Sequence, residues 1–173
     1  LTNHGNIDGL IKFQKEADKQ GITPILGCEA YIVPDLEDKS PGEKRGHICI
    51  WVKNQQGFEN LCQMLTAANL DGFYYKPRID YDLVLKHCEG LIFGTACTAS
   101  FIHLEGGEDF LLELWNKTKE VYLEIMPHNF PEQHKHNELC GCLHDEMKIP
   151  LLATNDCHYI LEEDSEAHDV LLK

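Results

Sequence analysis

The chain has 173 residues, of which 43% are hydrophobic, and a formal net charge of −14 from 29 acidic and 15 basic residues. This size allows one domain with a buried core, and the acidic surface argues against a general nucleic-acid-binding protein because it repels phosphate backbones. Acidic side chains together with ten histidines favour divalent cations instead. Any nucleic acid is expected to be presented by another domain or met only at bound metals.

Nothing in the given sequence resembles a signal peptide or an apolar run of membrane-spanning length, so we expect a cytosolic protein without membrane contact. Its eight cysteines form no C-x-x-C pair, which favours reduced thiols over a disulfide framework. The chain starts at Leu1 without an initiator Met and stops at Lys173 inside an apolar stretch. We therefore expect a single domain over residues 1–173 that is truncated at both ends.

Strand and helix patterns alternate along the chain. In chain order, they predict the polar exit of a strand at residues 1–6, a helix at 7–20, a strand at 24–33, a polar, exposed and mobile loop at 34–46, a strand at 47–52, a helix at 58–70, a strand at 90–95, helical spacing at 110–115, a strand at 121–125, a helix at 131–148 and a short apolar strand at 149–152. This alternation predicts an α/β fold of βα units around a parallel sheet or barrel.

Glu29 is unusual because it lies in the middle of the apolar strand predicted at residues 24–33. A buried carboxylate without a partner costs several kcal/mol, so it must be paired, protonated or bound to a metal. Both a metal-binding role and an ion pair therefore stay open for Glu29.

Asp156 and His158 follow the short apolar run at residues 149–152. The polar end of a buried strand is where α/β folds place their chemistry. On an extended segment, residues two apart point to the same side, so this carboxylate and this imidazole can bind one metal cluster. The alternative is an Asp that caps the next helix beside a half-exposed His.

Cys97 lies just after the strand predicted at residues 90–95 and is a candidate soft ligand, although a free thiol is also common as inert core. Three histidines fall on the helix predicted at residues 131–148, where we expect them on the solvated face: His134, His136 and His144.

The candidate ligands lie at or near predicted strands, whereas most other histidines lie on helices. These candidates are His4, Glu29, His47, Cys97, His128, Asp156 and His158. This segregation predicts a metal-dependent hydrolase, since hydrolysis of phosphate esters commonly uses two or more metals.

Residues 72–80 form an aromatic and basic island in an acidic chain. The combination can stack bases or bind phosphates, and it can equally be packing plus surface charge. The side chains that we assign to contact with nucleic acid or with a neighbouring domain are Tyr74, Tyr75, Lys76 and Arg78.

Four segments, in this order, resemble the PHP (polymerase and histidinol phosphatase) domain of bacterial DNA polymerase III alpha subunits. They are LTNHGN at residues 1–6, GCEAY at 27–31, GFYYKPRID at 72–80 and ATNDCHY at 153–159. The resemblance implies a distorted (β/α)7 barrel, here without its first strand, and two to three divalent ions (zinc, manganese or magnesium) at the strand ends. It implies metal ligands at His4, Glu29, His47, Cys97, Asp156 and His158, with His128 as a further ligand, and catalytic roles for Glu29, Asp156 and His158.

Two departures from the family pattern weaken the implied metal site. The family's first strand carries an H-x-H-S motif with two histidine ligands, and this chain begins after it. Asn3 stands where the family usually has the Asp of Thr-Asp-His-Gly, so the carboxylate that supports the neighbouring histidine is missing.

The resemblance implies a metal-dependent phosphoesterase within a replicative polymerase, which in some members removes 3′-terminal nucleotides as a 3′–5′ exonuclease. The alternatives are a degenerate, non-catalytic docking module and a free-standing PHP phosphatase, in which the Tyr-Tyr-Lys-Pro-Arg stretch has no evident role. The implied partners are the remaining domains of the parent polymerase, its exonuclease subunit, and DNA through the parent chain. The polymerase active site itself lies outside this sequence.

Overall fold

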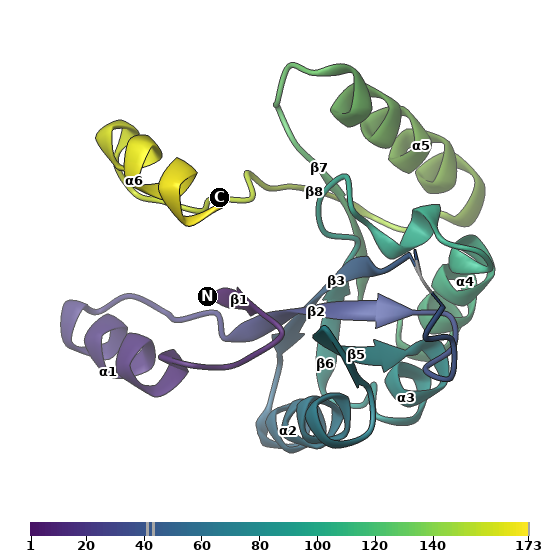
Figure 1. Ribbon diagram of the computed structural model, residues 1–173, viewed down its shortest axis with the longest axis horizontal. Helices are drawn as coiled ribbons and strands as arrows, with labels where there is room; N and C mark the ends of the chain where they lie inside the picture. Colours follow the sequence, from purple (N-terminus) through teal and green to yellow (C-terminus); the bar gives the residue numbers. More distant parts are fainter. Residues whose placement is uncertain (41, 43, 173) are drawn as a thin grey trace.

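The computed structural model describes residues 1–40, 42 and 44–172 and consists of one mixed sheet with helices around it (Figure 1). The strands are β1 (Thr2–His4), β2 (Gly27–Val33), β3 (Gly46–Val52), β4 (Phe73–Tyr74), β5 (Lys76–Asp80), β6 (Leu91–Gly94), β7 (Val121–Ile125) and β8 (Leu151–Ala153). The helices are α1 (Leu10–Gln20), α2 (Gln55–Leu70), α3 (Tyr81–Lys86), α4 (Gly107–Thr118), α5 (Pro131–Met147) and α6 (Ser165–Leu171), with 3₁₀ turns η1 (Phe101–His103) and η2 (Glu162–Asp164).

The strands form one sheet in the order β4-β5-β2-β3-β6-β7-β8, and β1 pairs with β2 outside this path. The prediction of an α/β fold is confirmed, but the expected parallel arrangement holds only in part, because β3 runs antiparallel to both β2 and β6. The segment between β2 and β3 has no helix in its described part, and strands joined without a crossover helix pair antiparallel. Residues 41 and 43 of the loop predicted there lie outside the described residues. Among the described strands, β8 and β1 do not pair with each other.

Helix positions follow the predicted periodicity, while capping residues set the starts. α1 begins at Leu10 rather than at residue 7, because the Asn6 side chain binds the Asp8 amide in a turn and Gly9 is left-handed at φ 80°. α2 begins at Gln55, where the Asn54 side chain accepts a hydrogen bond from the Gly57 amide at 3.0 Å.

The hydrophobic core lies between the sheet and the helices α2, α4 and α5. Its largest fully buried apolar side chains include Phe93, Phe101, Leu61, Met64 and Leu111. α1 and α6 instead extend away from the same side of the sheet, on the side where the N-terminus lies (Figure 1). No helix in the described part of the chain has both the length and the apolar character needed to cross a bilayer.

Two strands share one edge of β2, one after the other. β1 pairs with its first half, up to His4 opposite Glu29, and β5 pairs with its second half, from Arg78 opposite Tyr31. Gly5 lies at the junction with φ 66°, and a Cβ there would come within 2.9 Å of Pro77 Cγ and 3.2 Å of the Tyr31 ring. A glycine at position 5 therefore allows the start of β5 to pack directly against the end of β1.

The aromatic and basic island forms the hairpin β4–β5, with Tyr75 left-handed (φ 57°) at its tip. Arg78 is completely buried, and its guanidinium donates hydrogen bonds to the carbonyl oxygens of Gly72 (3.0 Å), Asp38 (2.8 Å) and Leu36 (2.9 Å). Arg78 thus attaches the segment after β2 to the hairpin from inside. Of the four side chains assigned to an external contact, Tyr74, Tyr75 and Lys76 are thus the ones that a ligand of the hairpin would meet.

Candidate metal centre

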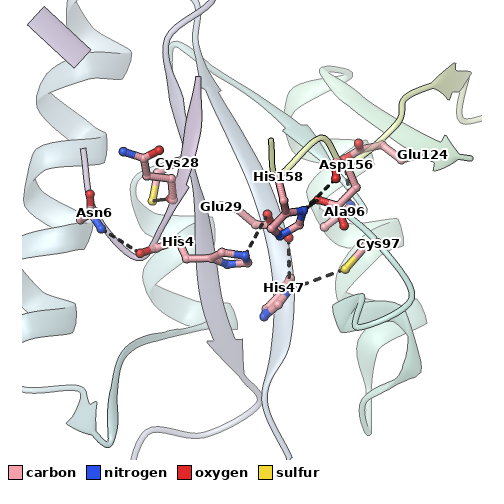
Figure 2. Close-up of polar contacts among 11 residues, drawn as sticks. His4, Asn6, Cys28, Glu29, His47, Ala96, Cys97, Glu124, Asp156 and His158 are labelled. Atoms are coloured by element: carbon pink, nitrogen blue, oxygen red, sulfur yellow. Dashed lines mark hydrogen bonds and ion pairs between the residues drawn. The ribbon is translucent and has the colours of Figure 1, made fainter. Parts of the chain in front are cut away.

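Three ligand side chains converge from three adjacent strands: His4 from the end of β1, Glu29 from β2 and His47 from β3 (Figure 2). In the sheet register, His4 pairs with Glu29, and His47 pairs with Tyr31, two residues further along β2. Residues two apart on a strand share a face, so strand pairing brings the three side chains to one place. One ligand atom from each lies within 4.8 Å of the other two.

Glu29 lies at the centre of this cluster and is only 5% exposed. One carboxylate oxygen is 3.1 Å from His47 Nδ1, and the other is 3.8 Å from His4 Nε2. The two imidazole rings are 4.9 Å apart. Glu29 is therefore paired with two histidines, and the same grouping of a carboxylate and two imidazoles is a set of cation ligands.

The contacts between these residues shift their pKa values. Burial by itself raises the pKa of Glu29, but the hydrogen bond to His47 and the nearby histidine charges lower it below its ordinary value. Burial lowers the pKa of His47, yet its contacts with Cys97 and Glu29 raise it to about 9. Burial is the main reason that the pKa of His4 is lowered. These shifts favour the ionised form of Glu29 and the protonated form of His47 at neutral pH.

Cys97 joins this cluster from the loop after β6. Its Sγ lies 3.7 Å from His47 Nδ1, and Figure 2 shows the thiol on the side of His47 that faces away from His4. The residue before it, Ala96, has a left-handed backbone with φ 59°. Such a conformation is uncommon for a residue other than glycine and needs support from its surroundings.

That support comes from Glu124 on β7, a residue that the sequence reasoning missed. Its side chain accepts a hydrogen bond from the Ala96 amide at 2.8 Å, and its own amide donates to the Thr95 hydroxyl at 2.8 Å. A Cβ on Gly94 would lie 2.2 Å from the same carboxyl oxygen, so the carboxyl occupies the space beside a glycine. Glu124 therefore holds the turn that presents Cys97.

Glu124 is 3% exposed, and burial raises its pKa above the ordinary value for a glutamate. The signal that could have identified it was present in the sequence, since it is a carboxylate inside the apolar strand predicted at residues 121–125. The same reasoning that singled out Glu29 applies to it.

Asp156 and His158 approach the cluster from the irregular segment after β8. The extended conformation expected there is wrong at Asp156, which is left-handed with φ 48°. His158 Nδ1 lies 2.8 Å from the Asp156 carbonyl oxygen and 3.7 Å from its carboxylate, and the His158 ring lies 5.9 Å from that of His4. A local turn therefore brings the two side chains to the rim of the cluster (Figure 2).

Two other histidines have different surroundings from those in the cluster. His128 hydrogen-bonds the Asn155 carbonyl oxygen at 3.0 Å and stacks on Phe130. His136 was expected on a solvated face, but it is 1% exposed and bonded to His103 (3.0 Å) and to the Glu124 carbonyl oxygen (3.2 Å). The reason is that α5 packs this face against β7. His134 is exposed as expected, whereas His144 is only partly exposed.

The cluster borders a cavity of about 360 Å³. Its polar lining includes Glu29, Cys49, Cys97, Glu124 and Asp156. With Cys157, which also lines it, the cavity holds three carboxyl groups and three thiols, a set that favours cations over anions.

The residues present fit a divalent cation, since imidazole, carboxylate and thiol are its usual protein ligands. His4 Nδ1 is buried and has no hydrogen-bond partner in the described part of the chain. Asn3 does not supply one, because its amide donates to the Asp8 carbonyl oxygen at 2.8 Å. His4 thus has a ligand's position without the supporting acceptor that metal-binding histidines usually have.

Comparisons with known proteins identify a family. The PHP domain family matches residues 1–130. The chain is similar to DNA polymerase III subunit alpha of Borreliella burgdorferi (37% identical over 186 residues), Treponema pallidum (36% over 185) and Deinococcus radiodurans (34% over 187). Each alignment covers 99% of this chain but only 16%, 16% and 14% of the respective relative. The chain therefore spans about a sixth of the length of these curated relatives.

Proposed function

This chain belongs to the PHP domain family, and we propose that it forms one PHP domain over residues 1–173 whose cluster of His4, Glu29 and His47 binds divalent cations and hydrolyses phosphodiesters. The observation that carries the proposal is the convergence of His4, Glu29 and His47 within 4.8 Å. Cys97, Asp156 and His158 extend the proposed ligand set at its rim. His128 belongs to it only if the segment after β7 moves toward the cluster.

The roles of these side chains follow from their surroundings. A divalent cation, when bound there, polarises a phosphoryl group and acidifies water. Glu29 is kept ionised by His47 and supplies the central negative charge of the ligand set. The His158 ring is oriented by the contact of its Nδ1 with the Asp156 carbonyl oxygen. We therefore assign to His158 and Asp156 the transfer of a proton from the attacking water or to the leaving oxygen.

The proposed substrate is the 3′-terminal phosphodiester of a nucleic acid, in keeping with the polymerase subunits to which the chain is similar. In this proposal the domain acts in the cytosol within a longer polymerase chain, as a 3′–5′ exonuclease beside the polymerase domains. A closed (β/α)7 barrel and docking of a separate exonuclease subunit are parts of the same proposal.

A second candidate function is a non-catalytic structural and docking module of the polymerase. It is favoured by the missing support for His4, where Asn3 bonds to Asp8 instead. A weakened cluster of this kind can stabilise a fold without turning over substrate.

The test is to measure bound zinc and manganese after equilibrium dialysis, and then cleavage of a 5′-labelled single strand with a free 3′ end. Glu29→Gln is compared with Glu138→Gln on the exposed face of α5. The phosphoesterase proposal expects metal and 3′ cleavage in the parent and in Glu138→Gln, and loss of both in Glu29→Gln. Bound metal without cleavage in the parent supports the docking module, and the absence of both refutes the metal site.

A further inference from the structure

The rim of the cluster at the end of β1 is formed by Tyr31 and Lys76. Tyr31 is two residues after Glu29 on β2 and thus faces the same side of the sheet. Its ring stacks on the His4 ring at 5.7 Å and meets the His47 ring edge-on at 5.3 Å. Lys76 begins β5, which continues along the same edge of β2 where β1 ends, and its Nζ lies over the Tyr31 ring at 5.5 Å.

Lys76 places an exposed positive charge beside an otherwise acidic site. The cluster and the adjoining cavity carry the carboxylates of Glu29 and Asp156, and these groups repel a phosphodiester. An ammonium at the rim offsets this repulsion for a phosphate that approaches from the hairpin side. The ring of Tyr31 keeps Lys76 at this position through a cation–π contact.

The tip of the hairpin presents aromatic surface next to this charge. Tyr75 is 76% exposed, and its left-handed backbone (φ 57°) turns it out of the β4–β5 ladder. Tyr74 supports it edge-on at 4.7 Å and in turn lies over the guanidinium of the buried Arg78 at 5.2 Å. Arg78 is fixed by three backbone carbonyls, so the exposed ring stands on a rigid base.

We propose that this rim binds the 3′-terminal segment of single-stranded nucleic acid, with Lys76 on a backbone phosphate and Tyr75 stacked on a base. The placement of the terminal phosphodiester at the cluster rests on the proposed function. A single strand fits because an aromatic platform needs an unstacked base. A duplex would bring many phosphates to a chain of charge −14, which opposes its binding.

The experiment measures fluorescence anisotropy of a 5′-labelled oligothymidylate with the full 173-residue chain in EDTA, over a series of salt concentrations. The variants are Lys76→Ala, Lys76→Arg and Tyr75→Ala. The matched controls, on α1, are Lys15→Ala, which removes the same charge, and Phe13→Ala, which removes an exposed ring. Circular dichroism verifies that each variant is folded, and metal content measured before EDTA is added verifies that it retains the cluster of the parent.

Tyr75→Ala is expected to weaken binding roughly 5- to 150-fold. Lys76→Ala is expected to lower the slope of log affinity against log salt by about 0.7, the value for one phosphate on a single strand, while Lys76→Arg keeps most of the slope. Both α1 controls should bind like the parent.

Because binding is measured without metal, the outcome separates this inference from the phosphoesterase proposal. Weaker binding by the hairpin variants supports the rim, and it does so even if the parent chain takes up no metal in equilibrium dialysis, the result that refutes the metal site. Affinities that match the α1 controls overturn the inference, whether or not the chain binds metal, and indicate a protein-docking role for the hairpin.

Discussion

The strand-borne and the loop-borne halves of the candidate metal centre are built differently. His4, Glu29 and His47 stand on three strands whose backbone pairing fixes their register. Asp156 and His158 stand on an irregular segment after β8, where the backbone of Asp156 is left-handed. None of the three strand-borne residues has a positive φ, whereas the loop-borne pair depends on a turn that costs of order 1 kcal/mol or more. We infer that the strand-borne half determines metal affinity and that the loop-borne half adjusts it.

The largest expected effect is on Glu29. Glu29→Gln removes the central charge shared by both histidines, so it should lower metal affinity beyond the roughly 10- to 100-fold loss typical of an outer-shell partner. It should also exceed the effect of replacing either histidine. Asp156→Asn is the matched change in the loop-borne half and should cost far less. Metal content after equilibrium dialysis compares Glu29→Gln with Asp156→Asn. Equal losses of metal in the two variants would contradict the division into a strand-borne and a loop-borne half.

The pH dependence of the strand-borne half follows from His47, whose pKa is raised to about 9. Its protonated form stabilises the metal-free chain fully below about pH 6.5, and this contribution is lost as the pH rises through 9. The expected decrease is up to about 3 kcal/mol. Metal binding should strengthen over the same range, since His47 must release its proton to become a ligand. Urea unfolding at several pH values measures the effect, and His47→Gln should remove that part of the slope.

Glu124 should affect stability more moderately, and through the turn that carries Cys97. Glu124→Ala leaves the buried Ala96 amide without an acceptor, which costs about 1–3 kcal/mol. Glu124→Gln keeps the acceptor oxygen and removes a carboxyl group whose ionisation is opposed by burial, which raises its pKa. Because the folded-state pKa is raised, this group destabilises the folded parent chain as the pH rises. We expect Glu124→Gln to be at least as stable as the parent at pH 8.

The rate at which Cys97 is alkylated, mapped by mass spectrometry, provides a second readout for these two variants. It should rise in Glu124→Ala and stay near the parent rate in Glu124→Gln. Alkylation at the parent rate in both would mean that Glu124 supports the fold without positioning the thiol.

The smallest expected effects are in the loop-borne half. His158→Ala should weaken metal binding by only a few fold, because the His158 ring lies at the rim, 5.9 Å from the His4 ring. His128→Ala should leave metal binding unchanged, since His128 bonds to Asn155 and stacks on Phe130. Isothermal titration with manganese measures both, and a loss in His128→Ala that equals the loss in His158→Ala would show that the segment after β7 closes onto the cluster.

Periodicity was sufficient to predict most helices and strands, because each has an apolar stripe or a continuous apolar run. Periodicity could not predict strand direction, since an apolar strand has the same sequence pattern in either orientation. The strand β3 was therefore predicted, but its antiparallel direction was not. The buried face of α5 was also hidden, because it carries the polar side chains Gln133 and His136.

The residues of the strand-borne cluster could be singled out from the sequence because their polar side chains interrupt or follow apolar strands. Their convergence could not be derived without the register of β1, β2 and β3. Arg78 was grouped with its exposed neighbours because two of its three backbone partners, Leu36 and Asp38, come from distant positions in the chain. Glu124 had the same sequence signal as Glu29 and was overlooked.

The antiparallel pairing of β2 with β3 also has a consequence for the order of folding. These strands are joined by the short segment 34–45, so bringing them together closes a much smaller loop than the β3–β6 pairing does. Local pairings of low sequence separation form faster than distant ones. Glu29 and His47 should therefore meet early, and a cation that binds this pair can favour the partly folded chain before β7 and β8 complete the sheet.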